Sequence, residues 1–208
     1  MSKINLYDTL NSSYGIKKGD SNLEKKGYIK DSKLSNHNQQ VWYNPRGKDL
    51  LVNVAGSHNI FDAGTDVYLA FGGLKSTNRY KEADKILKEA KSKYQPKSTL
   101  VSGHSLGSQV GAGITSKSDR FVGLDGGYTF GQKTRSNGGN HEHYRTSGDI
   151  VSLLGSGAKN MKTLKNPNQN TVLDAIGYSL APLTYGAYKA YQAHTDFSNI
   201  KDKQIRIR

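Results

Sequence analysis

The stretch from residue 99 to residue 114 constrains the fold more than any other part of this chain. It begins with the strand-forming run 99–102, passes through Gly103-His104-Ser105-Leu106-Gly107, and continues with small and apolar residues to Ile114. The first run has the composition of a buried strand, and the last has that of a helix. A side chain at either glycine position would collide with the neighbouring strand or helix. We therefore predict a strand, a forced turn at Ser105 and a helix.

A serine in that setting has a specific chemical meaning. A strand, a sharp turn and a helix form a nucleophile elbow, in which the serine Oγ stands clear of the backbone. The free N–H groups at the start of the helix then face the position where an oxyanion would form. The Gly-x-Ser-x-Gly pattern by itself is weak in a chain with 23 glycines in 208 residues. The strand-forming residues before the pattern and the helix-forming residues after it favour an elbow over an ordinary turn serine.

The surrounding sequence predicts an α/β fold. Residues 28–34, 41–43 and 50–55 have strand character and indicate an N-terminal β meander that ends in a central strand. An amphipathic helix over 79–94, capped by Thr77 or Asn78, joins that strand to the one at residue 99. Such a strand–helix–strand unit implies a parallel pair with a right-handed crossover. With a further strand at 120–125, we predict a central mostly parallel sheet with flanking helices.

Other segments are less specific. Residues 1–27 are expected to be an N-terminal extension of uncertain role with a short helix, while the whole of 1–208 is expected to form a single domain. Residues 60–76 suit either a lid or a packed connection. Residues 155–170 are expected to form a loop. The apolar residues 171–193 suit either two short helices or one helix and a packed segment, and the last dozen residues are expected to be a charged tail.

Charge and composition narrow the possible partners. The formal net charge of +13 favours an anionic surface such as a phospholipid membrane. The lysines are scattered, which argues against a specific nucleic-acid site. The chain has no cysteine, no apolar leader at its start and no apolar run long enough to span a membrane. We expect a cytoplasmic or virion-associated protein, and the oligomeric state is left open.

A serine hydrolase also needs a base and an acid that orients it. The order serine, acid, histidine belongs to the α/β-hydrolase design, and the chain offers Ser105, Asp149 and His194 in that order. Of the six histidines, His194 is the one that follows Asp149. Asp125 and Asp174 are rival acids.

Two more features bear on the site. Gly56 and Ser57 follow the central strand, where this design takes an oxyanion donor from a backbone N–H, although a surface turn has the same composition. The pair His141-x-His143 could hold a metal, but no convincing third ligand accompanies it. We therefore expect no metal and no cofactor.

The chain resembles the class 3, or fungal-type, lipase family of α/β hydrolases over about residues 28–200. Four segments carry the resemblance: Gly103–Gly107 as GHSLG, Thr129-Phe130-Gly131-Gln132 as TFGQ, residues 145–151 around Asp149, and Val54–Ser57 as the end of an RGS-like strand. The resemblance implies the triad Ser105, Asp149 and His194, with Ser57 and Leu106 as oxyanion donors. It favours Asp149 over Asp125.

The chain departs from the family pattern at three positions. Ala55 stands where the family has arginine, Ser108 where it has glycine, and Lys133 where it has proline. None of these removes a catalytic group, but the oxyanion loop is open to a different arrangement. The chain is short for the family and, in lacking cysteine, is similar to members encoded by large DNA viruses.

These observations lead to one expected function and two alternatives. The expected function is hydrolysis of lipid carboxylic esters through an acyl-enzyme. One alternative is a catalytically silent hydrolase-fold protein that serves as a basic virion or membrane-binding component. The other is a hydrolase of a different acyl bond, such as a thioester or an amide.

Overall fold

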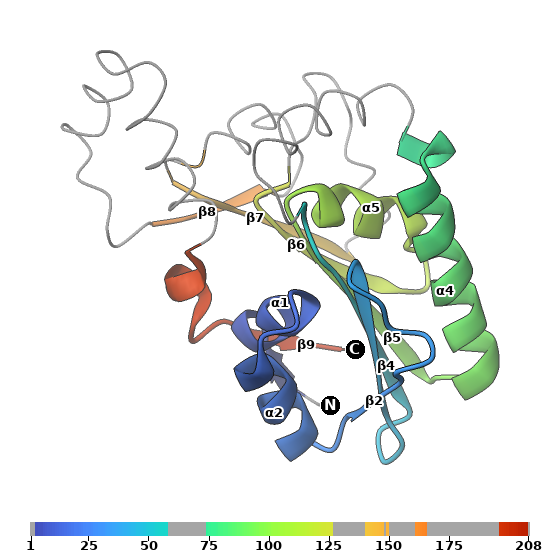
Figure 1. Cartoon of the computed structure of the whole chain (residues 1–208). Coiled ribbons are helices and arrows are strands. Elements are labelled where there is room, and N and C mark those ends of the chain that lie inside the picture. The colour runs from blue at the N-terminus through green and yellow to red at the C-terminus, as the bar shows by residue number, and fades with distance from the viewer. Residues whose placement is uncertain are drawn as a thin grey trace, which may run out of the picture.

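The computed structural model describes residues 3–57, 74–126, 140–147, 149, 161–165 and 196–207. Its centre is a seven-stranded sheet whose strands lie in chain order (Figure 1). The strands are β2 (Ile29–Lys30), β3 (Gln39–Asn44), β4 (Asp49–Val54), β5 (Ser98–His104), β6 (Arg120–Leu124), β7 (His141–Thr146) and β8 (Met161–Leu164). β2, β3 and β4 pair antiparallel, and every later pair is parallel. The predicted meander and mostly parallel sheet are confirmed.

Two helices cover one face of this sheet. The short helix η1 (Leu74–Ser76) precedes α4 (Asn78–Tyr94), which connects β4 to β5, and α5 (Leu106–Ile114) connects β5 to β6. Both crossovers advance by one strand in the same direction, so their common right-handedness places both helices on the same face (Figure 1). Thr77 caps α4 by accepting the N–H of Tyr80, as predicted.

The opposite face is covered by the two ends of the chain. α1 (Leu6–Ser13) and α2 (Lys17–Lys25) lie against it, with α1 packed on β4 and β5. β1 (Lys3–Asn5) pairs antiparallel with β9 (Gln204–Arg206), which follows the short helix η2 (Phe197–Ile200). Figure 1 shows this blue and red group on the side of the sheet away from α4.

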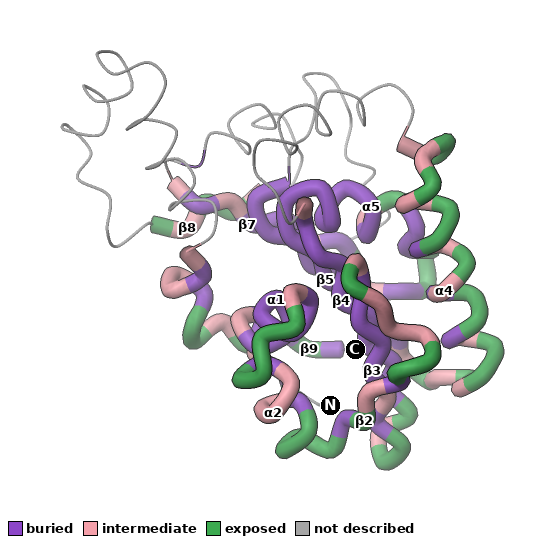
Figure 2. Tube along the Cα trace, viewed as in Figure 1, coloured by how far each residue is buried: buried purple, intermediate pink, exposed green. Residues whose placement is uncertain are grey.

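Alternating side chains of each strand join two separate apolar clusters. Leu51, Leu100 and Val122 pack with Leu10 and other residues from the chain ends. Their strand neighbours pack with the inner faces of α4 and α5; these are Val52, Val101 and Phe121. The central strands are therefore buried on both sides, as Figure 2 shows in purple.

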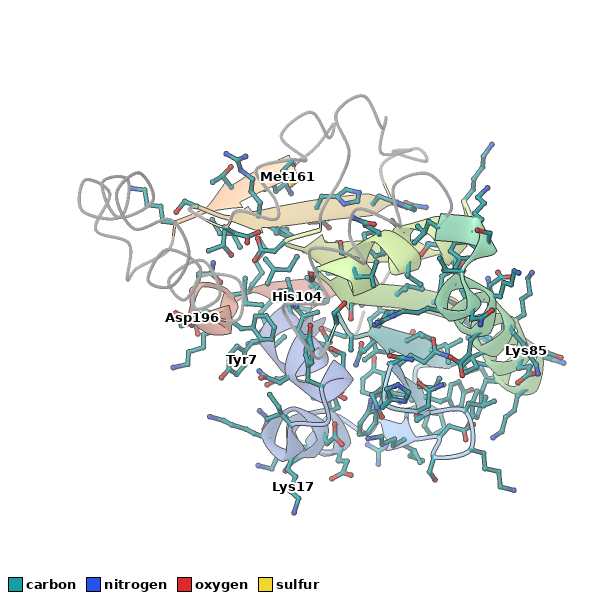
Figure 3. The ribbon with its side chains drawn as sticks, turned by 45° about the horizontal axis from the view of Figure 1, so that its top comes forward. Tyr7, Lys17, Lys85, His104, Met161 and Asp196 are labelled. Carbon is teal, nitrogen blue, oxygen red and sulfur yellow. The ribbon has the colours of Figure 1, made fainter. Side chains whose placement is uncertain are left out.

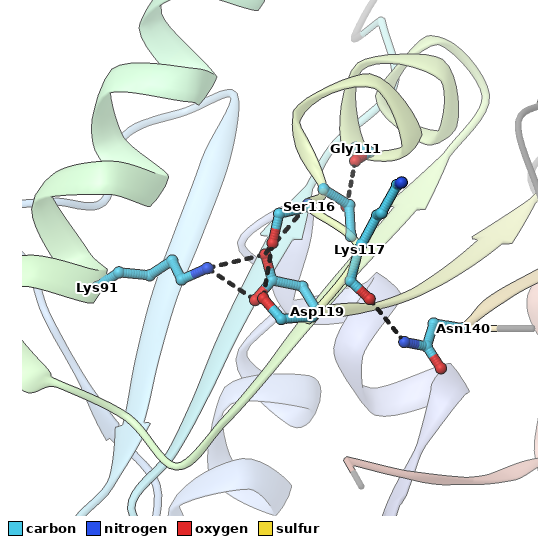
Figure 4. A network of polar contacts seen from close by, with 8 residues as sticks. Lys91, Gly111, Ser116, Lys117, Asp119 and Asn140 are labelled. Carbon is cyan, nitrogen blue, oxygen red and sulfur yellow. Dashed lines mark hydrogen bonds and ion pairs between the residues drawn. The ribbon is translucent and has the colours of Figure 1, made fainter. Parts of the chain in front are cut away.

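A polar network holds the far end of α5 in place (Figure 4). The Nζ of Lys91 on α4 lies 2.8 and 2.9 Å from the two carboxylate oxygens of Asp119. Asp119 also accepts the N–H and the hydroxyl of Ser116, and Asn140 donates to the carbonyl of Lys117. These contacts join α4, the turn after α5 and the start of β7.

The short helix expected within residues 1–27 is confirmed by α1, and α2 is a second helix in the same segment. Two other sequence-based expectations are corrected. The charged tail was a wrong prediction, because Ile205 and Ile207 are buried on either side of the exposed Arg206. The predicted loop 155–170 contains β8, which is polar because it lies at the edge of the described sheet.

Several predicted segments lie outside the described residues. They include 171–193, the TFGQ segment and all but 74–76 of the segment 60–76. Within the described part of the chain, no helix is long and apolar enough to cross a membrane.

Candidate active site

Ser105 makes the sharp turn between β5 and α5. Its backbone has φ 54° and ψ −127°, a region that residues with a side chain rarely occupy. β5 ends at His104 and α5 begins at Leu106, so Ser105 alone turns the chain. The predicted strand, turn and helix are confirmed. A buried serine held in a costly conformation at a strand end is an observation that points toward function.

Two glycines permit the close packing around this turn. A Cβ on Gly103 would lie 2.3 Å from the carbonyl oxygen of Gly107, and a Cβ on Gly107 would lie 2.2 Å from that of Ala55. The first turn of α5 therefore touches the backbone of both β5 and the residue that follows β4. No other residue type fits at either position without a shift of the backbone.

The backbone N–H groups near Ser105 differ in their availability. The N–H of Ser105 donates to the carbonyl oxygen of Leu124 at 3.0 Å and is committed to holding the turn. The N–H of Leu106 is the first of α5, where the helix itself offers no acceptor. This agrees with a role for Leu106 as an oxyanion donor, which stays a prediction.

Residues 55–57, here called the 55–57 loop, follow β4 and lie against Ser105. A Cβ on Gly56 would lie 2.9 Å from the Cβ of Ser105. The next residue, Ser57, is half-buried. Among the described residues, neither its buried Oγ nor its N–H has a hydrogen-bond partner. The predicted second donor thus comes one residue after a glycine that touches the serine.

Two side chains bind the backbone of the 55–57 loop. The N–H of Gly56 donates to the hydroxyl of Tyr14 at 2.9 Å, from the residue that caps the end of α1. On the other side, Nη2 of Arg79 donates to the carbonyl oxygens of Ala55 and Gly56. The loop is held by residues from both layers that cover the sheet.

Tyr14 also contacts the residue that precedes the serine. Its hydroxyl lies 2.6 Å from Nδ1 of His104, and the His104 ring stacks edge-on against Phe197 with 4.9 Å between centroids. Figure 3 places His104 beside α1 and the segment that begins near Asp196. Sequence reasoning missed Tyr14. Its spacing of four from Leu10 indicated an inward position, and a buried tyrosine hydroxyl usually needs a partner.

The structure separates the two acids at this edge of the sheet. Both carboxylate oxygens of Asp125 are engaged by Thr146, one by its N–H at 2.5 Å and one by its hydroxyl at 2.7 Å. Asp125 therefore ties the end of β6 to the end of β7. Asp149 is 1% exposed and closes the turn that follows β7, in which its N–H donates to the carbonyl of Thr146.

The structure describes two of the three predicted triad residues. Ser105 and Asp149 are both buried and follow parallel strands at the same edge of the sheet. His194 lies outside the described residues, and so does the rival acid Asp174. The roles of all three predicted triad residues remain predictions.

The two histidines of β7 point to the face covered by α5. Their rings each lie 5.3 Å from the ring of Phe121. Burial lowers the pKa of both, and that of His143 falls to about 4, with a further contribution from the neighbouring His141. At neutral pH they are uncharged. The described residues contain no group of three potential metal ligands, counting His, Cys, Asp and Glu.

No family model and no curated protein sequence matches the chain. Solved structures that it resembles include lipases from three fungi. The Rhizomucor miehei lipase–propeptide complex is 16% identical with a TM-score of 0.49, over 72% of this chain and 61% of that one. A lipase from Yarrowia lipolytica is 16% identical with a TM-score of 0.42, over 61% and 59%. One from Rhizopus microsporus var. chinensis is 16% identical with a TM-score of 0.43, over 68% and 63%. The matched region is about three fifths of the length of these similar lipases.

Proposed function

We propose that this chain is a serine hydrolase that cleaves carboxylic esters of lipids through an acyl-enzyme intermediate. The observation that carries the proposal is the backbone of Ser105, with φ 54° and ψ −127° between a parallel strand and a helix N-terminus. That conformation costs on the order of 1–3 kcal/mol and persists only where the surroundings enforce it. Here the Cβ of Ser105 lies against Gly56, and the first N–H of α5 follows directly in the chain.

The proposed reaction uses each predicted residue in one role. Oγ of Ser105 attacks the ester carbonyl carbon while His194 takes the serine proton, and Asp149 orients the imidazole. The N–H groups of Ser57 and Leu106 donate to the oxyanion. The C–O bond to the alcohol then breaks, and the imidazolium gives its proton to the departing oxygen. Water, activated by the same base, hydrolyses the acyl-enzyme and restores Ser105.

The lipid substrate is proposed from charge and from the family resemblance of the motifs. A protein of net charge +13 is attracted to anionic lipid surfaces, and this attraction is screened by salt. We expect faster hydrolysis of long-chain esters on anionic than on neutral vesicles, with an advantage that shrinks as salt rises. Equal rates on both carriers and a preference for short soluble esters would leave a simple esterase.

A fluorophosphonate probe tests the nucleophile directly. The wild-type protein should be labelled at Ser105, and Ser105→Ala should abolish both labelling and ester turnover. Ser118→Ala, which removes an exposed hydroxyl beyond α5, is the matched control and should behave as wild type. An unlabelled, inactive wild-type protein that still binds anionic vesicles would favour the catalytically silent alternative.

A further inference from the structure

We infer that Arg79 is a positioning residue that sets the direction of the Ser57 N–H. The inference rests on the proposed hydrolase function, in which that N–H stabilises the oxyanion. It assigns to a residue of α4 a task in the reaction that no sequence motif indicated.

The guanidinium reaches two successive peptide groups of the 55–57 loop. Nη2 of Arg79 donates to the carbonyl oxygen of Gly56 at 3.0 Å and also to that of Ala55. A single charged donor between neighbouring carbonyls restricts the rotation of both peptide planes. Charge-assisted hydrogen bonds of this kind are about twice as strong as neutral ones.

The planarity of the peptide bond transmits this restriction to the oxyanion donor. In a trans peptide the C=O and the following N–H are coplanar and point in opposite directions. The carbonyl of Gly56 shares its plane with the N–H of Ser57, so the bond from Arg79 aims that N–H away from α4.

The preceding peptide plane is held at both of its ends. The carbonyl of Ala55 is bound by Arg79, and the N–H of Gly56 by the hydroxyl of Tyr14 at 2.9 Å. These two peptide planes contain two carbonyl groups and two N–H groups. Among the described residues, the N–H of Ser57 is the one of these four groups without a hydrogen-bond partner.

The positive charge also acts through the peptide group itself. A cation that binds the carbonyl oxygen polarises the amide and makes its N–H a better donor, because hydrogen bonds in a chain strengthen one another. Removal of Arg79 should therefore weaken the Ser57 N–H as a donor as well as misdirect it.

The location of Arg79 is unfavourable for the helix that carries it. It lies in the first turn of α4, where the helix dipole disfavours a cation, and that turn has no acidic residue. Thr77 fixes the start of the helix through bonds to the Leu74 carbonyl and the Tyr80 N–H. The guanidinium is thus presented to the loop from a defined position.

Steady-state kinetics of Arg79→Ala, Arg79→Lys and a control test this role. The control is Lys91→Ala, which removes one positive charge and one ion pair from the same helix but lies beside Asp119, away from the loop. Loss of one oxyanion donor lowers kcat by about 10²–10³. We expect a smaller fall for misdirection, about 10- to 100-fold in Arg79→Ala, with KM changed less than about twofold. Arg79→Lys should lie between, because an ammonium keeps the charge but not the planar fork.

Chemical rescue separates positioning from a general structural role. Guanidinium ion at millimolar concentration, far below that which unfolds proteins, should restore part of the kcat of Arg79→Ala and leave wild type and Lys91→Ala unchanged. A kcat for Arg79→Ala equal to that of the control, or a loss seen only in KM, would overturn the inference. An inactive wild-type protein would overturn the proposed hydrolase function, and this inference with it.

Discussion

The two faces of the central sheet are covered by segments of different origin. On one face, α4 and α5 each connect neighbouring strands, so their positions follow from the handedness of parallel crossovers. On the other face, α1, α2 and the β1–β9 pair come from residues 3–25 and 197–207. Neither of these two crossovers places a helix on the second face, and among the described residues that face is covered by the chain ends.

The difference shows how the candidate site is divided between local and long-range structure. The strand, turn and helix of the elbow are indicated by residues close in sequence, although Leu124 and Ala55 also contact them. The contacts that hold the 55–57 loop come from the layers on both faces of the sheet. Tyr14 belongs to the layer formed by the chain ends, and Arg79 belongs to α4. The candidate site therefore lies at the carboxyl ends of the parallel strands, where residues from the layers on both faces of the sheet come together.

The largest expected effect distinguishes the two acids at that edge. Asp149→Asn should lower kcat/KM by about 10⁴ with little change in stability, because it would leave His194 wrongly oriented. Asp125→Asn should instead destabilise the fold by about 1–3 kcal/mol through its lost bonds to Thr146. Ester kinetics and urea unfolding of both variants make the test. An active Asp149→Asn beside an inactive, stable Asp125→Asn would move the acid role to Asp125.

The next prediction tests whether the layers on the two faces of the sheet contribute equally to its stability. Leu10 on α1 and Leu87 on α4 are both buried, at 0% and 3% exposure. Each change to alanine should reduce the free energy of unfolding by about 2–5 kcal/mol. Denaturant titrations give both values. A much smaller loss for Leu10→Ala would show that the chain ends cover the sheet without stabilising it.

A third prediction concerns two buried histidines, whose surroundings differ between the two faces of the sheet. His104 meets a tyrosine hydroxyl, whereas His143 lies beside Phe121 and has its pKa lowered by burial to about 4. As the pH falls below the ordinary value of 6.5, the unfolded chain binds this proton first, so stability is lost down to about pH 4. The loss from this group is on the order of 3 kcal/mol.

His143→Gln is the variant that isolates this contribution. It should unfold with a free energy that depends less steeply on pH between 6.5 and 4, as measured by urea titrations at several pH values. His37→Gln, which makes the same substitution at an exposed histidine on the turn before β3, is measured beside it for comparison. An unchanged slope in His143→Gln would show that another group carries the acid sensitivity.

The smallest expected effect comes from removing the hydroxyl of Tyr14, which lies on the face of the sheet that the chain ends cover. Tyr14→Phe removes the acceptor of the Gly56 N–H and the partner of His104 Nδ1, and we expect kcat to fall about tenfold, a loss of about 1.4 kcal/mol. Tyr80→Phe loses a comparable hydroxyl bond, to the carbonyl of Gly113 at 2.9 Å, and should keep wild-type kcat. Equal kcat in the two variants would mean that the 55–57 loop does not need Tyr14.

Local patterns were sufficient to predict the elbow side of the molecule. The small residues that flank Ser105, the cap at Thr77 and the apolar runs of β4 to β6 each report on neighbours within a few positions. For the same reason Ser57 and Ser105 could be chosen as candidates, since each follows a recognisable strand. Asp149 was chosen from the order serine, acid, histidine and from the family resemblance. Their relative distances required the register of the sheet.

Long-range contacts could not be predicted in this way. Ile205 and Ile207 alternate with arginines and read as a charged tail until β1 supplies a partner. Tyr14 and Arg79 bind the backbone of Gly56, from which they are separated by 42 and 23 positions in the sequence. The residues around Tyr14 and Arg79 do not indicate that either side chain binds Gly56. An arginine in the first turn of a helix, against the dipole, was the one local irregularity that pointed to Arg79.

The β1–β9 pair has a consequence for biosynthesis. Of the described elements, β1 leaves the ribosome first and its partner β9 leaves last. Until translation reaches β9, Ile4 has no strand beside it, and the nascent chain lacks the contacts that complete its apolar layer. The helix-covered face can assemble before β9 is made, whereas the other face closes only once β9 is available. A translating ribosome therefore carries a chain that already contains the elbow but that exposes apolar surface prone to aggregation until β9 emerges.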